Sequence, residues 1–270
     1  MCIRDSGYGG LTILDKIRGL MPEYDYIYLG DSARCPYGPR SFEVVYEFTL
    51  QAVSKLFELG CPLVILACNT ASAKALRTIQ QINLPVIDAT RRVLGVIRPT
   101  AECIGEITRS RHVGILATAG TIKSESYLLE IHKLSPDIVV TGEACPMWVS
   151  LVENNEYQSE GADYFVKQHI NRLLDKDPMI DTIILGCTHY PLLLDKIRQF
   201  TPGHIRIIAQ GEYVARSLQD YLNRHPEMDA RCEKGGKCRF LTTESENKFE
   251  ESASIFLGRQ DIKVESIALE

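Results

Sequence analysis

Short apolar runs alternate with segments of helical periodicity along almost the whole chain. The apolar runs predict strands at residues 24–30, 62–67, 84–88, 111–118, 137–142, 182–186, 205–209, 238–242 and 262–267. Apolar side chains recur three or four positions apart at 41–60, 71–82, 121–134, 161–176, 213–225 and 248–258, which predicts helices. The first of these has Ser41 as a predicted N-cap and Gly60 as its terminator. Such alternation is typical of an α/β fold, with parallel sheets covered by helices on both faces.

Two strand ends resemble each other closely enough to suggest an internal repeat. "VILACNT" (64–70) and "IILGCTH" (183–189) share three apolar residues, a small residue, a cysteine and two polar residues. Cys68 and Cys187 lie about one domain length apart, so we expect two similar α/β halves. Ligands of open parallel sheets sit beyond the carboxyl ends of the strands. Two such ends facing each other would form a cleft with one thiol on each wall.

Composition and charge narrow the class of protein. The chain of 270 residues is 45% hydrophobic and 24% charged, with a net charge of -5 that gives no electrostatic case for nucleic acid or anionic membrane as a partner. It has no apolar run long enough for a transmembrane helix and no signal-peptide core. The nine cysteines, without a C-x-x-C pair, favour reduced thiols in a cytoplasm. Cys232 and Cys238 could hold a metal together, but a Gly-rich turn is the preferred interpretation.

Cys68 and Cys187 differ from the other cysteines in their surroundings. A cysteine in an apolar run is usually a packing residue, and this is our interpretation of Cys2, Cys35, Cys61, Cys103 and Cys145. Cys68 and Cys187 each end their run, precede polar residues and open a predicted helix, whose unpaired N–H groups favour a thiolate. A thiol with a pKa of about 8.5 is only ~3% ionised at pH 7, so even a small lowering of its pKa raises the thiolate fraction several-fold.

Two thiols across a cleft suit removal of a proton from one face of a carbon and delivery to the other, which inverts a stereocentre. Candidate helpers are Asp5, His189 and Glu153, acting as proton relays. A nucleophilic hydrolase using Cys187 with His189 is the competing chemistry. It is disfavoured because side chains two residues apart rarely face each other, and because it leaves Cys68 without a role.

Three further segments at predicted strand ends suit a small anion. "DSGYGG" (5–10) places Ser6 and flexible backbone N–H groups before a helix. "CPYGP" (35–39) carries Tyr37 and Gly38 on a turn, and "ATAGT" (117–121) carries Thr118 and Thr121. Each segment alone reads as a turn or cap. Their significance is that all lie at strand ends.

The chain resembles the glutamate racemases, of the cofactor-independent aspartate/glutamate racemase family. The resemblance covers nearly the whole sequence and is carried by "DSGYGGL", "YLGDSARCPYG", "ACNTAS", "ATAGTI" and "GCTHYPLL", in that order. It implies two pseudo-symmetric, doubly wound parallel-sheet domains with the active site between them. The implied domain limits are 1–95 with 210–270 for a discontinuous N-terminal domain and 96–209 for a C-terminal domain.

The resemblance also implies roles for individual residues. Cys68 would act on the D-glutamate side with help from Asp5, and Cys187 on the L side with help from His189 and Glu153. The implied substrate contacts are Asp5, Ser6, Tyr37, Gly38, Asn69, Thr70, Thr118, Thr121, Thr188 and His189. The implied task is to supply D-glutamate for peptidoglycan in a bacterial cytoplasm, without pyridoxal phosphate or metal. Family members are often homodimers, so a second copy of the chain is a candidate partner.

Two features depart from the family pattern, and two alternatives stay open. The family has an apolar strand before the Asp-Ser pair, whereas "MCIR" puts Arg4 at a position expected to be buried, in a strand too short to span a sheet. Cys35 lies beside the Tyr37–Gly38 contact and is interpreted as a bystander. A relative of the same fold could racemise aspartate or isomerise another small acid. A non-catalytic amino-acid-binding protein would keep the anion contacts but tolerate loss of either thiol.

Overall fold

A computed structural model describes residues 1–258 and 262–269 of the chain. In it the strands form two separate parallel sheets. The first sheet has the order β10-β9-β2-β1-β3-β4, and the second has the order β6-β5-β7-β8. All paired strands run parallel. The strands are β1 (Cys2–Asp5), β2 (Tyr26–Gly30), β3 (Leu63–Leu66), β4 (Arg92–Gly95), β5 (His112–Ala117), β6 (Val139–Ala144), β7 (Thr182–Gly186), β8 (Arg206–Ala209), β9 (Cys238–Thr242) and β10 (Val264–Ser266).

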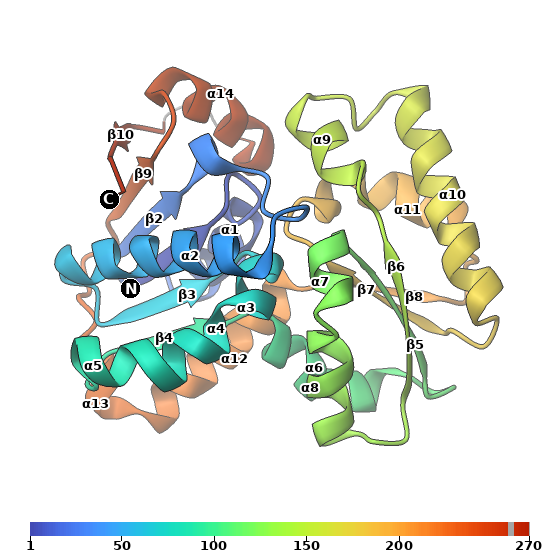
Figure 1. Cartoon of the computed structure of the whole chain (residues 1–270), viewed down its shortest axis with the longest axis horizontal. Helices are drawn as coiled ribbons and strands as arrows, with labels where there is room; N and C mark the ends of the chain where they lie inside the picture. Colours follow the sequence, from blue (N-terminus) through green and yellow to red (C-terminus); the bar gives the residue numbers. More distant parts are fainter. Residues whose placement is uncertain (259–261, 270) are drawn as a thin grey trace.

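Helices cover both faces of each sheet (Figure 1). On the first sheet, one core contains apolar residues of α1 (Leu11–Leu20), α12 (Gly211–Arg224) and α14 (Glu246–Leu257), and the other contains residues of α2 (Phe42–Glu58). On the second sheet, α9 (Trp148–Glu153), α10 (Glu160–Lys176) and α11 (Leu194–Phe200) share one core, whereas α6 (Ile97–Ile107) and α8 (Ser126–Leu134) share the other. The α/β class with two parallel-sheet domains is thus confirmed.

Short helices complete the connections between these elements. They are α3 (Asn69–Lys74), α4 (Leu76–Thr78), a π-helix (Ile79–Asn83), α5 (Leu84–Asp88), α7 (Ala119–Lys123), α13 (Pro226–Asp229) and 3₁₀-helices at Ser32–Arg34 and Tyr190–Leu193. Most of them lie directly after a strand or at the end of a longer helix. Several of them also add residues to the cores, among them Ile79 and Leu84 on the first sheet and Tyr190 on the second.

The chain passes between the sheets twice. The first passage follows β4, where Val96 still packs in the core of the first sheet while Ile97 packs in that of the second. The second passage follows β8, because Val214 on α12 returns to the first core. The limits 1–95, 96–209 and 210–270 stay a prediction, and residues 259–261 and 270 lie outside the described part of the chain.

Several local predictions can be compared with the elements. Helix α2 begins after Ser41, whose hydroxyl accepts a hydrogen bond from the Val44 N–H at 3.3 Å, so the predicted N-cap is confirmed. Gly60 adopts φ +89 two residues past its end, a conformation that suits glycine. The helix predicted at 121–134 is instead two helices, α7 and α8, separated near Glu125, which has φ 54.

The strand predicted at 84–88 is wrong, because these residues form helix α5. Pro85 occupies the first turn, where its missing N–H costs nothing. Val86 is 86% exposed, so the apolar run does not mark a buried strand. The strand of this region is β4, which pairs with β3 from Leu63–Arg92 to Leu66–Gly95.

The N-terminal strand is central rather than too short to span the sheet. β1 pairs with β2 on one side and β3 on the other, with Arg4 opposite Leu29 and Leu66. β3 and β4 contain as few residues as β1, so its length fits the sheet. Arg4 is fully buried, as the family pattern led us to expect.

The prediction of reduced thiols is wrong for Cys2 and Cys61, which form a disulfide, although both pack in a core as expected. Cys2 lies on β1 opposite Val64, and Cys61 lies just before β3, with 6.0 Å between the two Cα atoms. The pairing follows from strand adjacency, which the sequence spacing does not reveal. Cys145 is buried and Cys103 is partly exposed.

Two further features concern metals and membranes. Within the described ranges, no group of three or more His, Cys, Asp or Glu side chains is arranged to hold a metal ion. None of the helices in the same residues combines the length and apolar character needed to cross a bilayer.

Candidate active site

One small pocket is lined by both candidate thiols. It has a volume of about 20 Å³, close to the space for one water molecule. Cys68 and Asn69 follow β3 of the first sheet, whereas Cys187 and Thr188 follow β7 of the second. The predicted residues that line it are Ser6, Tyr37, Gly38, Cys68, Asn69, Thr70, Thr118, Cys187, Thr188 and His189, joined by Cys35, Pro36 and Val149. The predicted Asp5, Thr121 and Glu153 are not among the lining residues.

Cys68 is held as a thiol by its surroundings. Burial and then the negative charge of Asp5 raise its pKa to about 11, outweighing the positive charge of Arg4 and a hydrogen bond from Ser6. The backbone N–H of Ala71 in α3 favours the Cys68 thiolate, as expected of a helix N-terminus, but burial and the charge of Asp5 outweigh this effect.

Asp5 lies directly behind the pocket wall. It is fully buried, and its Oδ2 accepts a hydrogen bond from the Gly7 N–H at 3.0 Å. Its Oδ1 has no hydrogen-bond partner among the described residues. An acceptor atom of this kind near Cys68 is suited to receive a proton.

Cys187 begins a chain of polar contacts across the cleft. Its Sγ lies 3.8 Å from His189 Nδ1, and His189 Nε2 lies 3.0 Å from Glu153 Oε1. Cys35 donates from Sγ to the same Glu153 oxygen at 3.2 Å. Side chains two residues apart rarely face each other, but Cys187 and His189 do, because both lie in the turn between β7 and the 3₁₀-helix Tyr190–Leu193.

The charges of His189 and Glu153 depend on each other. Burial lowers the pKa of His189, but hydrogen bonds to Cys187 and Glu153 prevail and raise it to about 10. Burial raises the pKa of Glu153, whereas hydrogen bonds from His189 and Cys35 bring it below its usual value. At neutral pH the pair is therefore an imidazolium beside a carboxylate. It can pass a proton to or from sulfur.

Three threonine hydroxyls meet where the two halves approach each other. Thr70 Oγ1, after β3, lies 2.9 Å from Thr118 Oγ1 and 3.3 Å from Thr121 Oγ1, both after β5. Thr118 and Thr121 are 3.1 Å apart. Thr121 therefore supports the two threonines that line the pocket. The Gly120 N–H donates across the same boundary to the Gly38 carbonyl at 3.1 Å.

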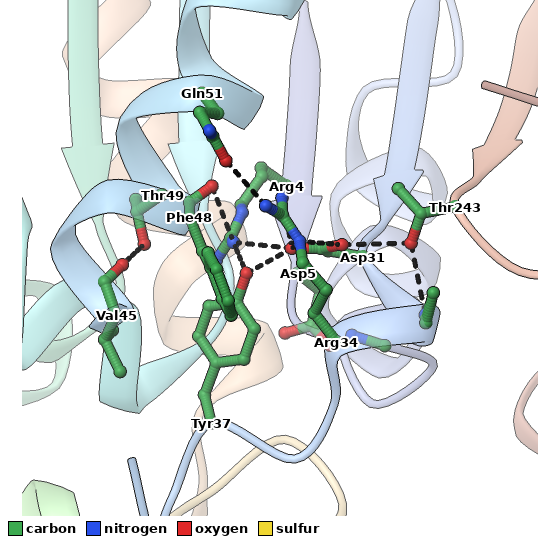
Figure 2. A network of polar contacts seen from close by, with 12 residues as sticks. Arg4, Asp5, Asp31, Arg34, Tyr37, Val45, Phe48, Thr49, Gln51 and Thr243 are labelled. Carbon is green, nitrogen blue, oxygen red and sulfur yellow. Dashed lines mark hydrogen bonds and ion pairs between the residues drawn. The ribbon is translucent and has the colours of Figure 1, made fainter. Parts of the chain in front are cut away.

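Tyr37 lines the pocket, and its hydroxyl belongs to a polar network with Arg4 and Asp31 (Figure 2). Its hydroxyl donates to Asp31 and accepts from the buried Arg4 guanidinium. Asp31 also accepts two bonds from Arg34 Nε, at 2.9 and 2.8 Å, and one from Thr243 at 2.9 Å. Because this network engages the Tyr37 hydroxyl, the ring and backbone of Tyr37 remain for the pocket.

A larger cavity of about 640 Å³ lies elsewhere, lined by residues of α3, α4, α6, α8 and α12. Neither Cys68 nor Cys187 lines it. The chemistry predicted from the sequence therefore belongs to the smaller pocket. Sequence reasoning treated Cys35 as a bystander, and only the contact with Glu153 gives it a place in the site.

Comparisons with known proteins show which family the chain resembles. The family model for Asp/Glu/hydantoin racemase matches residues 12–218. A glutamate racemase of Ruegeria sp. (strain TM1040) is 38% identical over 268 residues, which is 96% of either chain. A solved glutamate racemase of Bacillus anthracis has 35% identity and a TM-score of 0.89, covering 99% of this chain and 97% of its own.

A second solved structure carries a ligand. It is a glutamate racemase of Francisella tularensis in complex with D-glutamate, with 30% identity, a TM-score of 0.88, and coverage of 100% of this chain and 97% of its own. Sequence and structure thus agree over nearly the full length. The chain therefore belongs to the Asp/Glu/hydantoin racemase family and is an enzyme of the racemase class.

Proposed function

We propose that the chain is a glutamate racemase, which interconverts L- and D-glutamate by two-base proton transfer. The observation that carries the proposal is the pocket lined by Cys68 and Cys187, which come from the strand ends of two different sheets. Glutamate as the substrate is supported by the relatives and solved structures at 30% identity or more, which are named glutamate racemases.

The proposed reaction balances in two steps. A thiolate takes the α-proton, so that a C–H bond breaks and an S–H bond forms, leaving a carbanion. The opposite thiol then protonates the carbanion on its other face, which restores a C–H bond and inverts the centre. Cys68 is assigned to the D side and Cys187 to the L side.

The surroundings support this division of labour. With a pKa of about 11, Cys68 is ionised in about one molecule in a thousand at pH 8, so it is ready to donate a proton. His189 and Glu153 would move protons to and from Cys187 through the 3.8 Å contact. Asp5 would accept the thiol proton of Cys68 beforehand, which leaves the Cys68 thiolate that acts as base. Both thiols are thereby served by a relay of their own.

Substrate binding is assigned to the residues at the strand ends. Asn69, Thr70, Thr118, Thr188 and His189 offer polar atoms at the pocket, and Thr121 acts by holding the two threonines in front of it. Ser6, Tyr37 and Gly38 complete the proposed contacts. No step of this scheme uses a cofactor or metal.

The test is interconversion of the two enantiomers in D₂O, followed by circular dichroism and NMR. The wild type should place one deuterium on the α-carbon of the product at each turnover. Cys68→Ala and Cys187→Ala should each abolish racemisation, whereas Cys103→Ala, outside the pocket, should retain it. Racemisation by Cys68→Ala at the wild-type rate would refute the two-thiol mechanism.

Substrate profiling separates the alternatives. Faster racemisation of aspartate than of glutamate would reassign the substrate within the family. Binding of glutamate without exchange of its α-proton would make the chain an amino-acid-binding protein instead. We assign the enzyme to supply of D-glutamate for peptidoglycan in a bacterial cytoplasm. Expression in a bacterium that depends on added D-glutamate should then restore growth without it.

A further inference from the structure

Three buried side chains from distant parts of the sequence close a ring of hydrogen bonds. Asn69 Nδ2 donates to Gln210 Oε1 at 2.7 Å, and Gln210 Nε2 donates to the Tyr127 hydroxyl at 2.6 Å. The Tyr127 hydroxyl in turn donates to Asn69 Oδ1 at 2.7 Å. Each member donates one bond and accepts one. All three side chains are buried, so the ring operates without water.

A backbone carbonyl fixes the direction of this ring. Gln210 Nε2 also donates to the Val96 carbonyl at 3.1 Å, and it lies 3.0 Å from Thr100 Oγ1. A carbonyl can only accept, so the amide nitrogen of Gln210 must face it. Because the ring is closed, this choice also determines which end of the Asn69 amide faces Tyr127. The Asn69 amide is therefore held in one orientation.

The ring lies where the chain passes between the two sheets. Val96 follows β4 of the first sheet and Gln210 follows β8 of the second, so one side chain joins both passages. Tyr127 packs in a core of the second sheet. Asn69 follows Cys68 at the end of β3 and lines the pocket. The ring thus connects both halves to a residue next to a candidate base.

The small size of the pocket makes the position of the ring important for ligand entry. A volume of about 20 Å³ is too small for an amino acid, so the lining residues of the two halves must move apart to admit one. The passages between the sheets are the segments about which the halves can pivot. A ring that ties both passages to Asn69 is placed to fix the closed angle and the pocket residue together.

We propose that Tyr127 and Gln210 are positioning residues that orient the Asn69 amide toward the substrate and set the angle at which the two halves close. Asn69 Nδ2 uses one N–H in the ring and keeps the other for the pocket. Without the Tyr127 hydroxyl, the Asn69 amide keeps only its bond to Gln210 and can rotate about that bond. Its second N–H is then no longer held toward the pocket, so the variant binds glutamate weakly. The identity of this ligand rests on the proposed function.

The experiment compares Tyr127→Phe with Tyr26→Phe, which removes one buried hydroxyl donating to the Met21 carbonyl at 2.7 Å. Both variants should lose about 2–4 °C of melting temperature. Tyr127→Phe alone should raise KM for both enantiomers about tenfold and weaken D-glutamate binding equally in calorimetry. In an Asn69→Ala background, Tyr127→Phe should change D-glutamate affinity by less than about twofold.

A readout that needs no substrate tests the closing angle. The Gly120 N–H bonded to the Gly38 carbonyl should exchange with deuterium about tenfold faster in Tyr127→Phe and unchanged in Tyr26→Phe. Gln210→Met is the second variant and should reproduce both results. If KM, D-glutamate affinity and Gly120 exchange all stay at wild-type values, the ring is only structural and the proposal is wrong. Racemisation by the wild type is measured separately, so failure of the proposed function is recognised on its own.

Discussion

Replacing Arg4 by methionine should stabilise the protein, because its buried guanidinium is only partly satisfied. Arg4 is fully buried on β1, and among the described residues its Nε and Nη1 have no hydrogen-bond partner. Each unsatisfied buried donor costs about 1–3 kcal/mol. Only Nη2 is engaged: it donates to the Tyr37 hydroxyl and, at 3.5 Å, to the Phe48 carbonyl, and it lies 3.6 Å from Asp31.

Removal of Arg4 leaves Asp31 with other hydrogen-bond donors. Asp31 keeps two hydrogen bonds from Arg34 and one from Thr243 (Figure 2). Methionine has a similar length and leaves no polar atom unsatisfied. The two unsatisfied donors that disappear cost about 1–3 kcal/mol each, and the lost attraction to Asp31 offsets part of that gain, so we expect about 1–4 kcal/mol of net stabilisation. In a chain of this size each kcal/mol raises Tm by about 2–4 °C.

Urea unfolding followed by circular dichroism measures this change. Arg34→Met is the matched control and should destabilise the protein, because Asp31 then loses its two-bond partner. If Arg4→Met lowers the free energy of unfolding by more than about 1 kcal/mol, the buried pair is net stabilising and the reasoning fails.

The same substitution should slow the enzyme. The positive charge of Arg4 lowers the pKa of Cys68, although burial and Asp5 together still raise that pKa to about 11. Without Arg4, a smaller fraction of Cys68 is thiolate at any pH below that value. The kcat/KM for D-glutamate at pH 8 should therefore fall while Tm rises.

Three further predictions concern His189 and its neighbours. Gly9→Ala should reduce kcat at least about a hundredfold, because the added Cβ would lie 2.4 Å from Thr188 Oγ1 and 2.5 Å from His189 Nδ1. Gly19→Ala is the control and should keep the wild-type rate, because a Cβ at Gly19 has no neighbouring atom within 4 Å. The raised pKa of His189 contributes its full stabilisation of the fold below pH 6.5, and this stabilisation is lost as the pH rises through about 10. The stability difference between wild type and His189→Gln should therefore shrink between about pH 7 and pH 11 in urea titrations. Glu153→Gln should lower the pKa of His189 in an NMR titration, and an unchanged value would contradict the hydrogen-bond cause.

Sequence patterns predicted an element correctly where the pattern depends on neighbouring residues alone. The five-residue run of β7 is buried throughout, and Ser41 caps α2 through its own side chain. Residues 84–88 misled because their apolar run resembles a strand, yet Val86 faces solvent. What decides the outcome there is the pairing of β4 with β3, a contact between segments that sequence periodicity does not encode.

The candidate site divides in the same way. Cys68 and Cys187 were predictable because each ends an apolar run before polar residues, and both line the pocket. Cys35 gave no such signal, since its bond to Glu153 joins residues 118 positions apart. Gln210 and Tyr127 were also missed, because their bonds to Asn69 span 141 and 58 positions. A side chain that acts through a distant partner leaves no mark in its own segment.

The two thiols lie in unlike surroundings, which is compatible with a reversible racemisation. Cys68 has a buried carboxylate nearby, whereas Cys187 contacts an imidazolium that Glu153 holds. Enantiomers have equal free energy in water, so the two values of kcat/KM must be equal however the thiols are tuned. The unlike surroundings therefore cannot favour one product. They can only set which protonation state of the resting enzyme is populated, and hence how kcat and KM separate for each enantiomer.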